Sequence, residues 1–254
     1  MVKVYIANTA PLGEEEVYRL LYHSMDQDRR AKADRFLFAK DKRLCIGAGA
    51  LLRAALEKEG IFRYSIAKHP GGKPYLAGNG NLYFNLSHSG EMVMCAISDR
   101  EVGCDVEKKD GFDRKLADYV MTDDDLNRIY QQEGEQGRAD MFFRLWTLKE
   151  SYMKATGLGI LLEPKTFGME FYQGGIRAVP CADSRKFYFR EYLTDDGYCY
   201  SCCGLSEAFP DRMTELELGS IAMSGFHEPS GAQFTAKQKM CISAFVSNPV
   251  NRCL

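Results

Sequence analysis

The sequence has no long hydrophobic run and no excess of charge of one sign. No apolar stretch approaches the ~18 residues that a membrane span requires. Lys and Arg number 33 against 35 Asp and Glu, so the formal net charge is −2 and no global positive field is available to hold nucleic acid or an anionic membrane. The start, residues 1–10, is too short and too polar for a signal sequence. We therefore expect a cytoplasmic protein with no nucleic-acid and no membrane partner.

The nine cysteines lack the pattern of a disulfide framework or a zinc site. Their number is odd, their spacing is irregular, and the chain is too long for a small disulfide-stapled domain. Cys199 and Cys202 form a single Cys-x-x-Cys with no second pair and no histidine nearby. We expect reduced, mostly buried thiols.

Two further signatures are missing. The Gly-x-Ser-x-Gly elbow of hydrolases does not surround Ser87 and His88, and neighbouring strand residues point to opposite faces. The pairs Gly47/Gly49 and Gly157/Gly159 lack the third glycine of a dinucleotide fingerprint. Ser87 and His88, with Lys73 behind a Gly-Gly turn, instead fit a cluster of donors for phosphate.

Hydrophobic periodicity predicts an α+β protein. A helical pattern fills residues 12–60 and includes a basic segment, 29–43, whose default interpretation is a solvated helix face. Three short β-rich runs then predict an antiparallel meander: 82–88, 92–97 and 102–107. Helices are expected at 113–120, 123–132 and 139–156, and strands at 186–193, 197–204 and 215–222.

This order of elements predicts two similar lobes, each with helices packed on a small, mainly antiparallel sheet and related by a pseudo-twofold. We place the N-terminal lobe at residues 1–100 and the C-terminal lobe at 101–211. Residues 212–254 are expected to add a final strand and a tail, to which we assign no function.

Asp105 and Glu107 are the first candidate site residues. In the predicted strand 102–107 they share one face with Gly103, which leaves room for a close neighbour. Two carboxylates on one face repel each other unless a cation or a basic group lies between them. An exposed sheet face would also tolerate such a pair, and this alternative stays open on these residues alone.

The predicted helix 139–156 supplies the second group. Trp146, Glu150 and Lys154 follow at steps of four and so share one face of a helix that is apolar on most sides. A simple surface Glu–Lys pair is the alternative. A third carboxylate beside Asp105 and Glu107 would complete an oxygen-only site, which suits Mg²⁺.

Four blocks of this sequence, in this order, resemble the 4′-phosphopantetheinyl transferases, and specifically the large, two-lobed type that activates surfactin synthetase. They are Gly72-Lys-Pro74, the run 84–90 (Phe-Asn-Leu-Ser-His-Ser-Gly), the run 102–108 (Val-Gly-Cys-Asp-Val-Glu-Lys) and the run 143–154 (Phe-Arg-Leu-Trp-Thr-Leu-Lys-Glu-Ser-Tyr-Met-Lys). The resemblance covers about residues 28–205. It implies transfer of 4′-phosphopantetheine from coenzyme A to a serine of an apo acyl or peptidyl carrier protein, with release of 3′,5′-adenosine bisphosphate, in a site between the lobes.

The resemblance also implies a role for each candidate. Asp105, Glu107 and Glu150 would hold Mg²⁺, with Mn²⁺ as an alternative ion, against the pyrophosphate of coenzyme A. Glu150 would help to deprotonate the carrier serine, directly or through water, and Lys154 would stabilise or protonate the leaving pyrophosphate oxygen. The coenzyme would be bound by Lys32, Lys40, Lys73, Pro74, Ser87, His88 and Lys154.

Two other functions remain open on the sequence. A non-catalytic module for coenzyme A or a nucleotide would keep the phosphate donors, and a structural interaction protein would need none of them. Because one chain supplies both lobes, we expect a monomer. We expect the carrier protein to dock on residues 108–119. This segment combines basic with apolar side chains: Lys108, Lys109, Arg114 and Lys115 with Phe112, Leu116 and Tyr119. The identity of the carrier is not encoded in these motifs.

Overall fold

The computed structural model describes residues 1–78 and 80–224 as a mixed α+β fold, in agreement with the predicted class. A four-stranded sheet has the order β11-β1-β5-β4, and a three-stranded sheet has the order β6-β10-β9. The first comprises β1 (Lys3–Asn8), β4 (Tyr83–Ser89), β5 (Met92–Ser98) and β11 (Thr214–Glu215). The second comprises β6 (Val102–Lys108), β9 (Tyr188–Tyr192) and β10 (Tyr198–Gly204).

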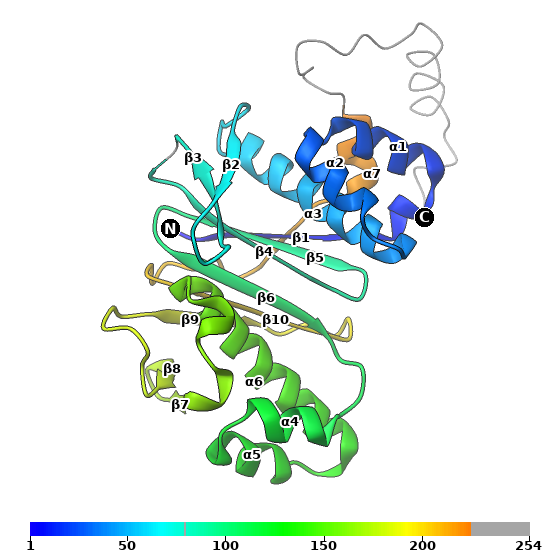
Figure 1. The fold of residues 1–254 in the computed structure, drawn as a ribbon. Helices are drawn as coiled ribbons and strands as arrows, with labels where there is room; N and C mark the ends of the chain where they lie inside the picture. Colours follow the sequence, from blue (N-terminus) through cyan, green and yellow to red (C-terminus); the bar gives the residue numbers. More distant parts are fainter. Residues whose placement is uncertain (79, 225–254) are drawn as a thin grey trace, which may run out of the picture.

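Helices cover the outer face of each sheet (Figure 1). Those over the first sheet are α1 (Glu15–Ser24), α2 (Gln27–Asp34), α3 (Ala39–Lys58) and α7 (Leu218–Met223). Those over the second are α4 (Arg114–Val120), α5 (Asp123–Tyr130) and α6 (Gly134–Thr156). Two hairpins, β2 (Ser65–Lys68) with β3 (Pro74–Ala77) and β7 (Gly168–Tyr172) with β8 (Gly175–Val179), and 3-10 turns at Ala10–Gly13, Gly159–Leu161 and Pro164–Thr166 complete the described chain.

The two sheets face each other across a hydrophobic core. Met94 and Ala96 of β5 pack there against Val102, Cys104 and other residues of β6 and β10. The alternate residues of β5, such as Val93 and Cys95, belong to the core under α1 and α3. Because both faces of β5 are covered, all seven of its residues are buried, which explains why its sequence is apolar without alternation.

Helix α6 lies directly on β6. A Cβ placed on Gly103 would come 2.1 Å from the carbonyl oxygen of Ser151 and 2.4 Å from the amide nitrogen of Ala155. Any larger residue at position 103 would therefore push the helix off the strand. The sequence-based expectation that Gly103 admits a close neighbour is confirmed, and the neighbour is the helix that carries Glu150 and Lys154.

Two details differ from the predicted elements. Strand β6 does not continue the β4–β5 meander: it pairs with β10 in the second sheet, antiparallel, with Asp105 opposite Ser201. The final strand is only two residues long and runs parallel to β1, and residues 218–222, expected in that strand, belong to helix α7. Leu218 and Ala222 pack into the core beneath α1 and α3. They are four positions apart and so lie on the same face of the helix.

The described cysteines fit the expectation of reduced, mostly buried thiols. All seven are free, and Cys45, Cys95, Cys104, Cys202 and Cys203 are buried. Cys241 and Cys253 lie outside the described residues. No helix in residues 1–78 and 80–224 combines the length and apolar character that crossing a membrane demands.

Candidate active site

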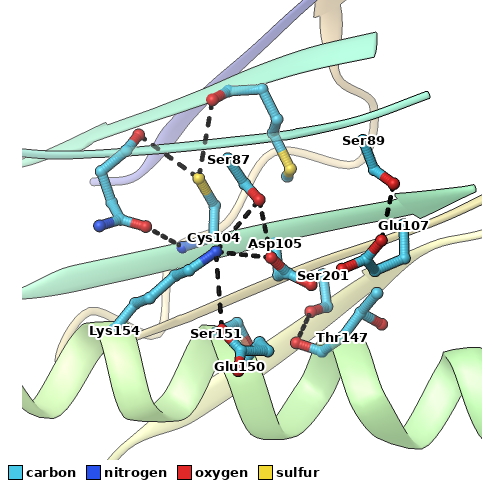
Figure 2. Close-up of polar contacts among 12 residues, drawn as sticks. Ser87, Ser89, Cys104, Asp105, Glu107, Thr147, Glu150, Ser151, Lys154 and Ser201 are labelled. Carbon is cyan, nitrogen blue, oxygen red and sulfur yellow. Dashed lines mark hydrogen bonds and ion pairs between the residues drawn. The ribbon is translucent and has the colours of Figure 1, made fainter. Parts of the chain in front are cut away.

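Asp105 lies at the centre of the candidate site, between β4, β6 and α6 (Figure 2). It is only 2% exposed. Its Oδ1 accepts hydrogen bonds from Ser87 Oγ at 2.7 Å and from Lys154 Nζ at 2.6 Å. Lys154 Nζ also donates to Ser87 Oγ at 3.1 Å and lies 3.9 Å from Glu150 Oε2. The structure thus brings together four of the predicted site residues from three elements.

The second oxygen of Asp105 has no partner. Oδ2 is buried and accepts no hydrogen bond. An unsatisfied buried carboxylate oxygen is costly, and each such group in a native protein calls for an explanation. A cation at this oxygen would remove the cost.

Glu107 lies two residues after Asp105, on the same face of β6, and is also held by hydrogen bonds. Its Oε2 accepts a hydrogen bond from Ser89 Oγ at 2.7 Å (Figure 2). The same Ser89 oxygen accepts a hydrogen bond from the backbone amide of Lys108 at 3.1 Å. Asn85, on the same face of β4, accepts a hydrogen bond from the amide of Cys104 through its Oδ1. The alternate residues 85, 87 and 89 therefore tie β4 to β6 through side chains.

The charges of these groups depend on each other. Burial and the nearby Asp105 raise the pKa of Glu107, while hydrogen bonds with Ser89 and Trp146 and the charge of Lys154 lower it in part. Burial also raises the pKa of Glu150, against the opposing charge of Lys154. Burial opposes the charge of Lys154, but Asp105 and Glu150 outweigh it and raise the pKa of the ammonium. The site in this state is an ion pair flanked by two carboxylates that favour a cation.

His88 lies on the opposite face of β4 from Ser87 and is exposed. Although part of the side chain reaches solvent, the surrounding protein atoms displace water from the ring and lower its pKa, and the charges of Lys154 and Lys32 lower it further. His88 is thus within electrostatic reach of a lysine from α2 and a lysine from α6. Lys40 is exposed in the first turn of α3, and within the described residues no hydrogen bond or ion pair joins it to His88 or Ser87.

The ammonium of Lys73 already has hydrogen-bond partners within the protein. The side chain is 12% exposed, and its Nζ bonds to Glu101 Oε2 at 2.9 Å and to the carbonyl oxygens of Val102 and Ala155 at 3.2 and 3.3 Å. It therefore fastens the turn before β3 to the start of β6 and the end of α6. Pro74 follows as the first residue of β3.

Two family models match consecutive parts of the chain. Residues 12–100 match the N-terminal region of 4′-phosphopantetheinyl transferases, and residues 101–203 match the 4′-phosphopantetheinyl transferase superfamily. The chain belongs to this superfamily. The 4′-phosphopantetheinyl transferase Sfp of Bacillus subtilis is 27% identical over 220 residues, which cover 84% of this chain and 96% of Sfp. The transferase gsp of Aneurinibacillus migulanus is 28% identical over 218 residues, covering 82% and 88%.

A third similar protein covers less of both chains. The L-aminoadipate-semialdehyde dehydrogenase-phosphopantetheinyl transferase of Xenopus laevis is 30% identical over 149 residues, 52% of this chain and 49% of that protein. Together these findings confirm the predicted family, a 4′-phosphopantetheinyl transferase of the Sfp type, and its enzymatic nature. A non-catalytic binding module is not favoured.

The residues of the transferase fit a hard divalent cation, which this family typically uses. Among the described residues no three Asp, Glu, His or Cys side chains stand as a ready-made cluster. The charged oxygen donors nearby are carboxylates, with the hydroxyls of Ser87 and Ser89 beside them, and Oδ2 of Asp105 is buried and unpaired. Such a donor set suits Mg²⁺, which binds through few carboxylates and keeps waters and substrate phosphates as its other ligands.

Sequence reasoning missed two residues of the transferase site. Ser89 and Asn85 were quoted within a motif, but no role was assigned to them. Their signal is alternation: the polar residues at 85, 87 and 89 share one strand face, as do Gly103, Asp105 and Glu107. Two such faces in consecutive strands favour a side-chain contact between them.

Proposed function

We propose that this transferase moves 4′-phosphopantetheine from coenzyme A onto a serine hydroxyl of an apo acyl or peptidyl carrier protein at the β4–β6–α6 site, releasing 3′,5′-adenosine bisphosphate. The observation that carries this placement is Asp105, which is buried, bonded through one oxygen to Lys154 and Ser87, and unpaired at the other. Family membership supports the reaction, and the geometry supports the place.

In this proposal Asp105, Glu107 and Glu150 hold Mg²⁺ or, alternatively, Mn²⁺. When bound, the ion neutralises the charge of the pyrophosphate and orients it. Glu150, whose pKa is raised by burial, accepts the proton of the carrier serine, directly or through water. Lys154 keeps its charge beside Asp105 and stabilises the oxygen on which the bisphosphate leaves.

The anionic end of coenzyme A is assigned to the basic groups around β4. Lys32 and Lys154 both act electrostatically on His88, so an anion near His88 would experience all three groups. Ser87 offers its hydroxyl within the same network, and Lys40 extends the basic surface from α3. Lys73 and Pro74 contribute through the turn that Lys73 fastens to α6.

The proposed site lies between two lobes of similar plan, residues 1–100 and 101–211, each a sheet covered by helices. The boundary between the two matched family models, at residues 100 and 101, supports this division. Ser87 comes from the first part, and Asp105 and Lys154 come from the second. Since one chain supplies both sides, we propose a monomer.

The carrier protein is proposed to dock on residues 108–119. Tyr119 is 76% exposed and Leu116 is 42% exposed, and both lie on α4. Arg114 is exposed on the same helix and pairs only loosely with Asp118, at 3.8 Å. An exposed apolar and basic surface next to the end of β6 is suited to an acidic helix that begins with the acceptor serine.

Intact-mass measurement tests the function. An apo carrier protein incubated with coenzyme A, Mg²⁺ and the transferase should gain the mass of one phosphopantetheine group. Asp105→Asn should abolish the gain, and Asp124→Asn, at an exposed carboxylate in the first turn of α5, should not. A carrier that gains no mass from the wild-type enzyme, or gains it equally from Asp105→Asn, contradicts the proposal.

A further inference from the structure

Ser89 makes two hydrogen bonds that leave its hydroxyl a single orientation. Its oxygen accepts from the backbone amide of Lys108 at 3.1 Å, and its proton is donated to Glu107 Oε2 at 2.7 Å. The amide has no acceptor capacity, and an ionised carboxylate has no proton to give. The direction of both bonds is therefore fixed.

The end of β4 that carries Ser89 is itself held in place. The β4–β5 turn passes through Gly90, whose φ of 60° favours glycine. The hydroxyl of Tyr198, on β10, accepts a hydrogen bond from the amide of Glu91 at 3.0 Å, and a Cβ on Gly90 would come 2.4 Å from that hydroxyl. The turn is thus packed against the strand that pairs with β6, and Ser89 has little freedom to move.

Without a fixed hydrogen-bond donor the carboxylate of Glu107 would tend to turn away from Asp105. It lies on the same strand face as Asp105, and the two negative charges repel each other. The hydrogen bond from Ser89 holds one oxygen of Glu107 in place, and Trp146 interacts with the same carboxylate. A carboxylate held by a fixed donor is oriented as a metal ligand requires.

We propose that Ser89 is a positioning residue that fixes the carboxylate of Glu107 for the divalent cation, with the indole of Trp146 as a second support. This inference rests on the proposed function, since it takes the cation as given. It goes beyond the assigned roles because Ser89 touches neither the coenzyme nor the carrier in that proposal.

Trp146 also provides a built-in readout. It is the only tryptophan of the chain, so all indole fluorescence reports on this site. Mn²⁺ is paramagnetic and quenches an excited indole at short range, whereas Mg²⁺ does not. Mn²⁺ bound by Glu107 should therefore quench the emission of the wild-type protein, and added Mg²⁺ should compete and restore it.

The test compares Mn²⁺ affinity in three serine variants, measured by fluorescence quenching and by calorimetry on the full chain with coenzyme A present. Ser89→Ala should weaken Mn²⁺ binding about tenfold, the usual effect of losing a group that orients a metal ligand. Ser89→Thr keeps the hydroxyl and should restore most of the affinity. Trp146→Phe should weaken binding in the calorimetric assay as well.

Ser98→Ala is the matched control. Ser98 also ends a strand, accepts a backbone amide hydrogen bond, from Arg100 at 3.2 Å, and donates to a neighbouring carboxylate, Asp99. It lies at the opposite end of the β4–β5 hairpin from Ser89, so the variant should bind Mn²⁺ as the wild type does. Unchanged Mn²⁺ affinity in Ser89→Ala, or equal loss in Ser89→Thr, overturns the positioning role alone. Failure of the wild-type protein to bind Mn²⁺ overturns the cation site as well, and with it both proposals.

Discussion

The ammonium of Lys154 lies 2.6 Å from Oδ1 of Asp105, although 49 positions separate the two residues in the chain. The pair joins the last turns of α6 to the middle of β6, at the place where Gly103 lets helix and strand touch. Lys154 therefore supplies a positive charge to one oxygen of the buried Asp105 carboxylate. This arrangement determines how the site should respond to substitution.

Asp105→Ala should lower the free energy of unfolding by about 1–3 kcal/mol, because it removes the charged partner of a largely covered lysine. The substitution also relieves repulsion among three carboxylates, which would raise the free energy of unfolding. We expect this gain to be smaller than the loss of the pairing with Lys154. Urea unfolding monitored by circular dichroism measures the change. Asp110→Ala, at an exposed carboxylate, serves as the control, and a stabilised Asp105→Ala would show that repulsion dominates.

Lys73→Met should act on stability before it acts on coenzyme binding. The substitution leaves Glu101 and two carbonyl oxygens without their shared donor, at a cost of about 1–3 kcal/mol. The KM for coenzyme A should rise only modestly, because Lys73 acts on the coenzyme site through the turn that it fastens. Lys68→Met, at an exposed lysine of β2, should alter neither quantity. A large rise in KM with unchanged unfolding free energy would instead make Lys73 a direct phosphate contact.

His88 should link coenzyme binding to a proton. Its pKa is lowered in the free protein by loss of solvent and by Lys154 and Lys32, and a bound phosphate would favour the charged ring. Binding should then take up a proton, so affinity should rise as the pH falls from about 8 to about 6. Calorimetry in buffers of different ionisation enthalpy measures the uptake. His88→Gln should abolish it, and His23→Gln, at an exposed histidine of α1, should not.

The lowered pKa of His88 has the opposite effect on folding stability: acidification should favour coenzyme binding but destabilise the fold. Because the pKa of His88 is lower in the folded chain than in the unfolded one, the unfolded chain binds more protons between the two values. The contribution of His88 to stability is therefore full above pH ~6.5 and declines as the pH falls through the folded-state pKa. His88→Gln should reduce this loss of stability on acidification, as acid titration of the unfolding midpoint would show. If the unfolding midpoint of His88→Gln falls with decreasing pH as much as that of the wild type, His88 is not the group responsible.

Reversing Arg114 and Lys115 to Glu should raise the KM for the carrier protein without changing coenzyme A affinity. Both residues lie at the exposed start of α4, and steered association depends on such charges. The effect should fade as salt increases. Arg63→Glu with Lys68→Glu makes the same change in net charge at a distant surface and should leave carrier kinetics unaltered. Normal carrier kinetics at low salt in the α4 variant would remove this segment from the interface.

Much of the site could be predicted from local periodicity. Alternation along residues 102–107 places Asp105 and Glu107 on one face, and helical spacing places Glu150 and Lys154 together; the structure shows both. The partner of β6 could not be predicted in this way, because Tyr198 and the other pairing residues of β10 are about ninety positions away. The hydrogen bonds of Lys73 to Glu101 and Ala155, and of Ser89 to Glu107, are equally non-local, so local periodicity could not predict them.

The return of β11 and α7 to the first sheet has a consequence for synthesis on the ribosome. Thr214 pairs with Tyr5, and Leu218 enters the core that α1 and α3 begin to form some two hundred residues earlier. The N-terminal half therefore leaves the ribosome with its β1 edge unpaired and a gap beside α3, and it stays so until the second half has emerged. The nascent chain should remain sensitive to proteases until that point, so the half made first is the half finished last.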